Sequence, residues 1–221
     1  MQIRKLCENH RVKLVVFCST GGTGRELVRQ ALELGHEVTA VARHAQALGI
    51  AHERLRIFEG DALQQISVDA AIKGQGALLS ALGTRSLFKH ITLFSQSAEC
   101  IVGSMERQGV QRLIVESSLG VGDSRGQLGF LGTWIAVPVF LARIYADKER
   151  QESIIARSQL HWTIVRPAML TKGPQRGNYR TWSGAAPKPS ASRISRADVA
   201  HLMLSILTKT ETYHRGINCS Y

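Results

Sequence analysis

The sequence predicts an α/β protein built on a doubly wound, mostly parallel sheet. Three observations lead to this prediction. Short apolar runs rich in β-branched residues alternate with segments that have helical periodicity. The first of these runs ends in a glycine-rich turn. An apolar content of 44% with 20% charged residues suits one globular core and excludes a disordered or fibrous chain.

The expected elements follow one another in a regular order. Lys13–Cys18 is a β-branched strand that enters the turn Ser19–Gly24, and a helix over Arg25–Leu34 leads to a second strand, Glu37–Arg43. The remaining expected elements are strands at Leu55–Glu59, Ala77–Leu82, Arg112–Glu116 and Trp162–Val165 and helices at about Asp61–Lys73, Ile91–Gln108 and Ala142–Ser158. Strands separated by helices imply parallel βαβ units, so we predict a Rossmann-type sheet in a single domain, residues 1–221.

The C-terminal third departs from this rhythm. Thr171–Arg193 contains three prolines, three glycines and no acidic residue, which predicts a long functional loop or a small cap. We interpret residues 171–196 as a substrate-side loop region. Ser195 and Asp198 have the spacing of a capping box, which opens a helix through Leu207. A last strand near Ile217–Ser220 is expected to close the edge of the sheet.

The net charge of +11 is concentrated late in the chain. From Arg166 onward there are nine basic and two acidic residues, against nineteen basic and fifteen acidic residues before it. Such a field suits a nucleic-acid or an anionic small-molecule partner. We rank nucleic acid last, because few aromatic residues accompany the basic ones.

The sequence contains no pattern typical of a metal site, a signal peptide or a membrane span. The four cysteines, Cys7, Cys18, Cys100 and Cys219, lie far apart with no zinc-ligand spacing, so we expect reduced thiols and no metal. The apolar run near the N-terminus is too short for a signal peptide, which favours a cytoplasmic protein. The longest uncharged run, Gly126–Ala142, has seventeen residues and falls short of a bilayer span.

A candidate phosphate site lies at the first strand-to-helix turn. Gly21 and Gly24 would let backbone N–H groups approach a pyrophosphate at the positive end of the helix. Cys18 stands where a longer G-x-x-G-x-x-G pattern has its first glycine. The alternative is a strand-to-helix turn without a ligand.

Arg43 ends the second strand, nineteen residues beyond Gly24. In dinucleotide-binding folds an acidic residue there binds the ribose 2′-hydroxyl, whereas an arginine suits a 2′-phosphate. NADP(H) is therefore favoured over NAD(H). The alternative is a solvated arginine at the end of a strand.

Other candidate residues follow the carboxyl ends of later strands, where ligands bind in open α/β sheets. Asp61 either caps its helix or binds an adenine amine. Gly83 and Thr84 either line the ribose and nicotinamide or form an ordinary loop. Ser117 and Ser118 would provide a proton donor or a hydrogen bond to the substrate. The alternative is that both are packed serines at the end of a strand.

The tyrosine and lysine pair of ordinary short-chain dehydrogenases is missing. Tyr145 is followed four residues later by Glu149 rather than by a lysine. Carbonyl reduction by that acid pair is disfavoured.

Taken together, four motifs resemble the atypical short-chain dehydrogenases with an NAD(P)H-binding domain, the NmrA-like group. These motifs are Thr20–Gly24, Gly35–Arg43, Ala81–Arg85 and His161–Pro167. Within the group, Gly177–Arg180 and Ser192–Asp198 look most similar to biliverdin-IXβ/flavin reductases. The resemblance covers nearly the whole chain.

The resemblance implies a set of cofactor-binding residues and two catalytic candidates. Ser118 would face the reaction centre, and Lys148 matches a lysine that many relatives keep, although Ile144 holds the usual tyrosine position. The implied cofactor-binding residues are Thr20, Gly21, Gly22, Thr23 and Gly24 at the pyrophosphate, Arg43 at the 2′-phosphate, Asp61 and Ala62 at the adenine, Leu82, Gly83, Thr84, Arg85 and Ser117 near the ribose and nicotinamide, and Pro167, Ala168 and Met169 along the nicotinamide edge.

The expected function is an NADPH-dependent reductase that passes hydride to a flavin, a quinone or a similar conjugated small molecule. The basic stretch would draw in an anionic acceptor, or it is a solvated loop; it consists of Lys172, Arg176, Arg180, Lys188, Arg193 and Arg196. The rival is a non-catalytic NAD(P)-sensing regulatory protein of the NmrA-like type. We expect a monomer or a homodimer.

Overall fold

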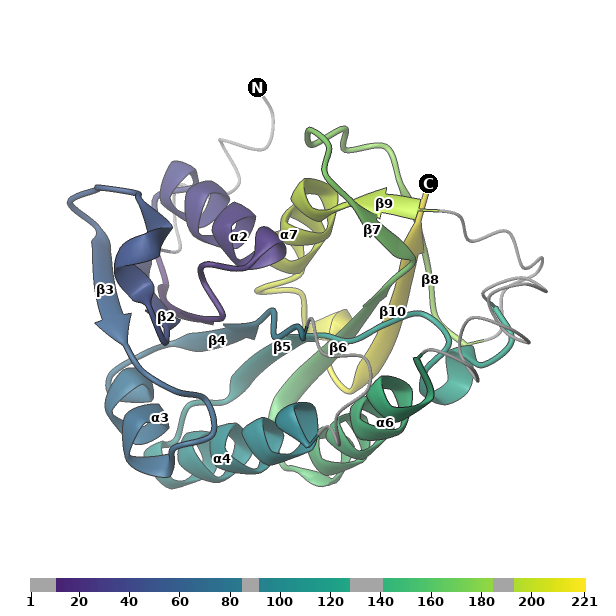
Figure 1. Cartoon of the computed structure of the whole chain (residues 1–221), viewed down its shortest axis with the longest axis horizontal. Helices are drawn as coiled ribbons and strands as arrows, with labels where there is room; N and C mark the ends of the chain where they lie inside the picture. The colour runs from purple at the N-terminus through teal and green to yellow at the C-terminus, as the bar shows by residue number, and fades with distance from the viewer. Residues whose placement is uncertain (1–10, 85–91, 128–140, 185–192) are drawn as a thin grey trace.

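The computed structural model describes residues 11–84, 92–127, 141–184 and 193–221. Its main feature is an eight-stranded sheet with the strand order β3-β2-β1-β4-β5-β6-β10-β8 (Figure 1). The strands are β1 (Lys13–Phe17), β2 (Glu37–Ala42), β3 (Leu55–Glu59), β4 (Ala77–Ser80), β5 (Arg112–Glu116), β6 (His161–Pro167), β7 (Met169–Thr171), β8 (Arg180–Trp182), β9 (Arg193–Ser195) and β10 (Arg215–Ser220). The helices are α2 (Gly22–Glu33), α3 (Gln65–Ile72), α4 (Leu93–Gln108), α6 (Ala142–Arg157) and α7 (Arg196–Ser205).

The predicted α/β class and the Rossmann-type sheet are confirmed. Seven neighbouring strands run parallel, and the order reverses at β1, from which the chain continues to β2 on one side and later to β4 on the other. In open sheets the carboxyl ends of the strands at such a reversal form the ligand-binding crevice. The fold therefore places the glycine-rich turn after β1 at the crevice.

The core lies in two layers, one on each face of the sheet. Figure 1 shows α2 and α7 on one face and α3, α4 and α6 on the other. Alternate residues of β1 divide between the layers: Leu14 and Val16 pack with α2 and α7, whereas Val15 and Phe17 pack with the helices of the opposite face. Because both faces are covered, the central strands read as continuous apolar runs, and this is why they could be predicted.

Several expected boundaries differ from the structure. The helix expected from Arg25 begins three residues earlier, at Gly22, so that part of the glycine-rich turn forms the first turn of α2. The helix expected from about Asp61 begins at Gln65, because the Asp61 carboxylate instead accepts the Leu63 N–H at 3.0 Å in the preceding turn. The strand expected to close the sheet, β10, lies between β6 and β8. The edge strand is β8, which pairs with β10 in the antiparallel sense and comes from the segment interpreted as a loop.

The rest of the 171–196 region is also partly ordered into strands. Thr171 is the last residue of β7, and Arg193–Ser195 form β9, which pairs with β7 in parallel as a separate two-stranded sheet. The N-cap role of Ser195 is confirmed, since its hydroxyl accepts the Asp198 N–H at 3.0 Å at the start of α7. The reciprocal half of the capping box is absent, because the Ser195 N–H donates to the Tyr221 hydroxyl at 3.1 Å instead. In the described ranges no helix is both long and apolar enough to cross a membrane. The uncharged run expected at Gly126–Ala142 lies mostly outside the described residues.

A buried ion pair joins α6 to β6 beneath the carboxyl ends of the strands. Arg166 donates to both carboxylate oxygens of Glu152, at 3.0 and 2.8 Å, and also pairs with Asp123. Gly122 and Gly216 allow this arrangement, because a Cβ on either would collide with the Arg166 guanidinium. Removal of one partner would leave a buried charge without compensation.

We predict that Glu152→Gln lowers the free energy of unfolding by about 3 kcal/mol, because the buried Arg166 keeps its charge, loses its buried counter-ion and retains only the exposed Asp123. The matched control is Glu149→Gln on the same helix, whose partner Arg125 is exposed. Chemical denaturation measures both variants. Equal destabilisation of the two would show that the Arg166 pair has no special structural role.

Candidate functional site

The turn between β1 and α2 is built around two backbone constraints. Cys18 adopts a positive φ of 60°, and its carbonyl oxygen accepts the Gly21 N–H at 2.9 Å. A Cβ at Gly24 would collide with that same carbonyl oxygen, so this position accepts only glycine. Ser19 fixes the turn against β2, since both its N–H and its hydroxyl donate to the Val41 carbonyl at 3.1 Å. The chain therefore reverses tightly, and α2 starts at the carboxyl end of the central strand β1.

The backbone N–H groups in the first turn of α2 lack a hydrogen-bond acceptor among the described residues. Gly21 is the N-cap and provides no side-chain hydrogen bond, and the first turn contains no acidic residue. No described residue accepts the N–H groups of Gly22, Thr23 or Gly24. Helix α7 is the opposite case, because Ser195 caps it. These free amides, together with the positive end of the helix dipole, fit the phosphates of a dinucleotide.

Arg196 adds a cation to this turn, and it comes from the far end of the chain. Its side chain lies against Gly22, so closely that a Cβ at Gly22 would overlap its Cδ. Helices α2 and α7 are held together by packing and by the Gln30 side chain, which donates to the Ala197 carbonyl at 2.9 Å. The sequence marks Arg196 only as one of several basic residues, because its position over the glycine turn depends on tertiary packing.

Cys18 lies at the edge of the same turn. Its side chain is half-buried, and burial raises the pKa of the thiol while hydrogen bonding to the backbone of Gly83 opposes the rise. The thiol therefore stays protonated at neutral pH. It lies where β1 and β4 end side by side.

The residues expected at the adenosine side lie at the carboxyl ends of β2 and β3. Arg43 is exposed directly after β2, and its guanidinium makes no ion pair with any residue that the structure describes. Asp61 and Ala62 follow β3, and Ala62 is buried. Asp61 caps a turn, as described above, and its second carboxylate oxygen accepts no hydrogen bond from a described residue.

The residues expected near the nicotinamide follow β4, β5 and β6. Leu82 and Thr84 are half-buried after β4 and Gly83 is exposed, whereas Arg85 lies outside the described residues. The Ser117 hydroxyl is buried, and no residue that the structure describes forms a hydrogen bond with it. Ser118 is half-buried. Pro167 and Ala168 are buried at the end of β6, and Met169 is 65% exposed.

Lys148 lies on α6, on the sheet face opposite α2. It is only 5% exposed, and its ammonium stands over the Phe94 ring, 4.4 Å from the centroid. Burial lowers its pKa to about 8, although the carboxylates of Glu116, Glu152 and Asp147 oppose the shift. None of these carboxylates is within ion-pair distance of the ammonium. Lys148 is thus a buried amine that can exchange a proton near neutral pH.

Tyr145 is next to position 144, where an isoleucine replaces the usual tyrosine, and its hydroxyl already forms a hydrogen bond. Ile144 is buried, and the neighbouring Tyr145 hydroxyl donates to the Leu119 carbonyl at 2.9 Å. Burial raises the pKa of Tyr145 to about 12. Tyr145 does not replace the absent acid.

The comparisons with known proteins agree with this geometry. Residues 19–210 match the family described as NAD(P)H-binding, so the chain belongs to that NAD(P)H-binding family.

Two sequence relatives carry no activity in their names. An uncharacterized chloroplastic protein of Arabidopsis thaliana is 28% identical over 75% of this chain, and the match spans 62% of that longer protein. The uncharacterized protein YwnB of Bacillus subtilis is 23% identical over 90% of this chain and 94% of its own length.

Two solved structures share the fold. A short-chain dehydrogenase/reductase of Veillonella parvula, solved in complex with NADP, has a TM-score of 0.79 at 18% identity and covers 96% of this chain and 95% of its own. The anaerobilin reductase ChuY of Escherichia coli O157:H7 has a TM-score of 0.77 at 24% identity, with 94% and 96% covered.

Two glycine substitutions test the architecture of the turn. Gly24→Ala should lower the free energy of unfolding by about 2 kcal/mol or more, because the added methyl meets backbone atoms that cannot move independently. Gly22→Ala should be nearly neutral for stability, since the methyl meets only the flexible Arg196 side chain. Thermal and chemical denaturation measure both. A neutral Gly24→Ala would contradict the described turn.

Proposed function

We propose that this protein is an NADPH-dependent reductase that transfers hydride to a flavin, a quinone or a similar conjugated acceptor. The observation that carries the proposal is the open first turn of α2 at the reversal point of the sheet, with Arg43 exposed after the neighbouring strand. When bound, NADPH supplies a hydride, which carries two electrons and one hydrogen, and one further proton completes the reduction of the acceptor.

The chain's own residues would position the cofactor by charge and by close backbone approach. Amides of the segment from Thr20 to Gly24 would hold the diphosphate, joined by the Arg196 guanidinium from α7. Arg43 would pair with the 2′-phosphate, which explains a preference for NADPH. The other proposed contacts are Asp61 and Ala62 to the adenine, Leu82, Gly83, Thr84, Arg85 and Ser117 to the ribose and nicotinamide, and Pro167, Ala168 and Met169 to the nicotinamide edge.

Lys148 and Ser118 would contact the acceptor and supply its proton. The Lys148 ammonium has no described counter-ion within ion-pair distance, so a nearby acceptor that gains negative charge would attract it. With a pKa of about 8, Lys148 holds a proton at neutral pH and can donate it. The Ser118 hydroxyl would orient the acceptor or pass the same proton. A flavin or quinone needs no more acid than this, which fits the absence of a tyrosine at position 144.

A second candidate function is that of an NAD(P) sensor that changes partner without chemistry. Ile144 at the tyrosine position favours it, because the acid of ordinary short-chain dehydrogenases is lost. Steady-state NADPH oxidation with FMN, riboflavin and quinones as acceptors separates the two functions. A reductase consumes NADPH with at least one of them. A sensor binds NADPH and NADP⁺ with different affinities and gives no turnover.

We predict a division of labour between two arginines in cofactor binding. Arg43→Ala should weaken NADPH about 10-fold to 100-fold and leave NADH nearly unchanged, because only NADPH carries the 2′-phosphate. Arg196→Ala should weaken both cofactors by a similar factor, because both carry the diphosphate. Nicotinamide fluorescence titration measures the four dissociation constants.

The control is Arg29→Ala, which removes an equal charge from the exposed side of α2, where Arg29 pairs with Glu26 and Glu33. It should leave both affinities unchanged. If Arg43→Ala weakened NADH as much as NADPH, the 2′-phosphate assignment would be wrong. An Arg196→Ala variant with normal affinity for both cofactors would remove that residue from the diphosphate site.

The proton-donor role of Lys148 predicts a pH dependence. The reduction rate should fall as pH rises through about 8, because Lys148 loses its proton there. Lys148→Met should lower kcat about 100-fold and abolish that limb of the profile. Lys209→Met, at an exposed lysine beyond α7, is the matched control. A Lys148→Met profile that keeps the limb near pH 8 would assign the proton to another group.

A further inference from the structure

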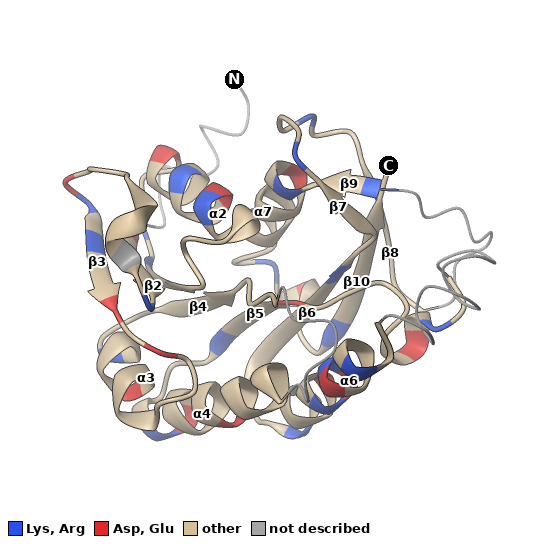
Figure 2. Ribbon diagram, in the orientation of Figure 1, with Lys and Arg blue, Asp and Glu red and all other residues tan. Residues whose placement is uncertain are grey.

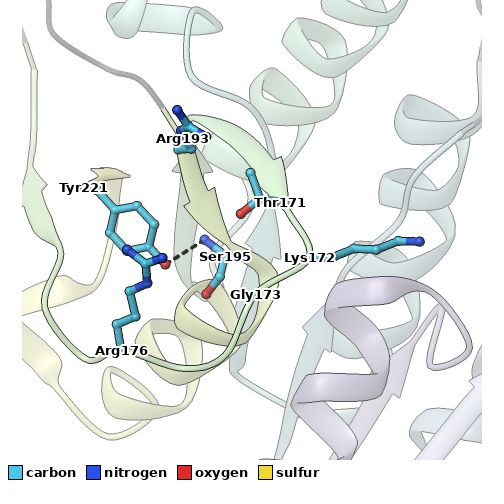
Figure 3. Close-up of a pocket in the computed structure, with 7 residues that line it drawn as sticks. All are labelled: Thr171, Lys172, Gly173, Arg176, Arg193, Ser195 and Tyr221. Carbon is cyan, nitrogen blue, oxygen red and sulfur yellow. Dashed lines mark hydrogen bonds between the residues drawn. The ribbon is translucent and has the colours of Figure 1, made fainter.

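A cavity of about 340 Å³ lies between the β7–β9 pair and the end of β10 (Figure 3). Its lining includes the side chains of Thr171, Lys172, Arg176, Arg193 and Tyr221. Strand pairing builds it, because Thr171 stands opposite Ser195 in the β7–β9 register and the Tyr221 N–H donates to the Arg193 carbonyl at 3.1 Å. This volume is within the range of small-molecule sites.

All the charged side chains that line this cavity are positive. Lys172, Arg176 and Arg193 are exposed at its walls, and none forms an ion pair with a residue that the structure describes. Figure 2 shows basic segments in blue on β9 and on the loop that follows β7. Arg176 and Arg193 lie on the same side of the β7–β9 pair, whereas Figure 3 shows the Lys172 side chain directed away from them. The two guanidinium groups without counter-ions create a field that attracts anions.

The Asp198 carboxylate lies close to the cavity but forms no ion pair with these cations. Asp198 is fully buried, and four donors occupy its two oxygens: the Arg176 and Gly177 N–H groups at 2.8 Å each, the Ser195 hydroxyl at 2.9 Å and the Tyr221 hydroxyl at 2.6 Å. Burial opposes its ionisation, but these hydrogen bonds outweigh it and lower the pKa of Asp198. Asp198 thus serves as the internal scaffold of the cavity, and the guanidinium groups stay available to a ligand.

Tyr221 also holds one of the cations in place. The Arg176 guanidinium lies 4.8 Å from the centroid of the Tyr221 ring, and the Tyr221 hydroxyl is fixed between Ser195 and Asp198. Figure 3 shows Arg176 stacked on this ring at one side of the cavity, with Arg193 and Thr171 farther along the β7–β9 pair. A planar guanidinium that is already oriented can bind an oxyanion through two parallel N–H···O bonds.

The cavity approaches the proposed nicotinamide edge at one residue pair of the β7–β9 sheet. Met169 is directly opposite Arg193 in the β7–β9 register, so the two side chains share one face, and neighbouring strands are about 5 Å apart. The proposed phosphate ligands of the cofactor lie elsewhere, at the start of α2 and after β2. An acceptor at the nicotinamide could therefore extend an acidic group into the cavity without displacing the cofactor.

We propose that this cavity binds the phosphate monoester of an anionic acceptor through Arg176 and Arg193. This inference rests on the proposed reductase function and adds the acceptor's chemical class, a conjugated ring system that carries a phosphate. FMN and riboflavin are the matched probes, because they have the same ring system and differ by one phosphate.

The binding experiment uses the full chain with NADP⁺ present, so that it needs no turnover. Flavin fluorescence titration compares FMN with riboflavin in the unmodified protein, in Arg176→Ala and in Arg193→Ala. We expect each substitution to raise the dissociation constant of FMN at least tenfold and that of riboflavin less than twofold. Arg215→Ala, an exposed arginine at the opposite end of β10, should change neither. Equal losses for FMN and riboflavin, or an equal effect of Arg215→Ala, would overturn the proposal.

A competition experiment separates the acceptor's phosphate from free phosphate. If the cavity takes the phosphate of FMN, inorganic phosphate weakens FMN competitively and leaves riboflavin unaffected. If inorganic phosphate binds in an Arg176-dependent manner but never competes with FMN, the cavity is a free-phosphate site and the acceptor assignment is wrong. Absence of NADPH oxidation with every acceptor would contradict the reductase function, whereas the FMN to riboflavin ratio still decides the cavity's ligand.

Discussion

The tight reversal between β1 and α2 is the constraint on which the rest of the arrangement depends. The carbonyl of Cys18 receives the Gly21 N–H and leaves no room for a side chain at Gly24. Helix α2 must therefore begin within a few residues of the central strand, where the sheet changes direction. Its first amides end at the crevice with no described acceptor, and a buried or half-buried polar group in that state favours a ligand that supplies the missing oxygens.

Helix α7 links the proposed cofactor site at the glycine turn to the basic cavity. Its first residue, Arg196, lies on the glycine turn, while Asp198, two residues later, organises the loop and the Tyr221 ring of the basic cavity. Because Asp198 is buried and accepts hydrogen bonds at both carboxylate oxygens, it forms no ion pair with the basic side chains of the cavity. The C-terminal third can thus keep its positive field on the surface that faces ligands, even though it contains a buried acidic group.

Sequence patterns predicted the parts of the fold that depend on local burial. The apolar runs of β1, β2, β3 and β5 are buried between two helical layers or bounded by clear turns, so their type and limits could be read nearly to the residue. Strands β7, β8 and β9 have three residues each in a proline-rich segment, and their existence depends on partners distant in sequence. The same holds for the site: the glycine turn and Arg43 could be found from spacing, but the approach of Arg196 to Gly22 and the stacking of Arg176 on Tyr221 arise only from tertiary packing.

The most direct test of the central claim is to follow the backbone amide signals of residues 20–24 by NMR while NADPH is added. If the open first turn of α2 receives the diphosphate, the amides of Gly22, Thr23 and Gly24 shift strongly and saturate at the same cofactor concentration as the nicotinamide fluorescence. ADP-ribose, which has the diphosphate but no nicotinamide, should shift the same amides. Saturable binding with these signals unmoved would place the cofactor elsewhere and contradict the account.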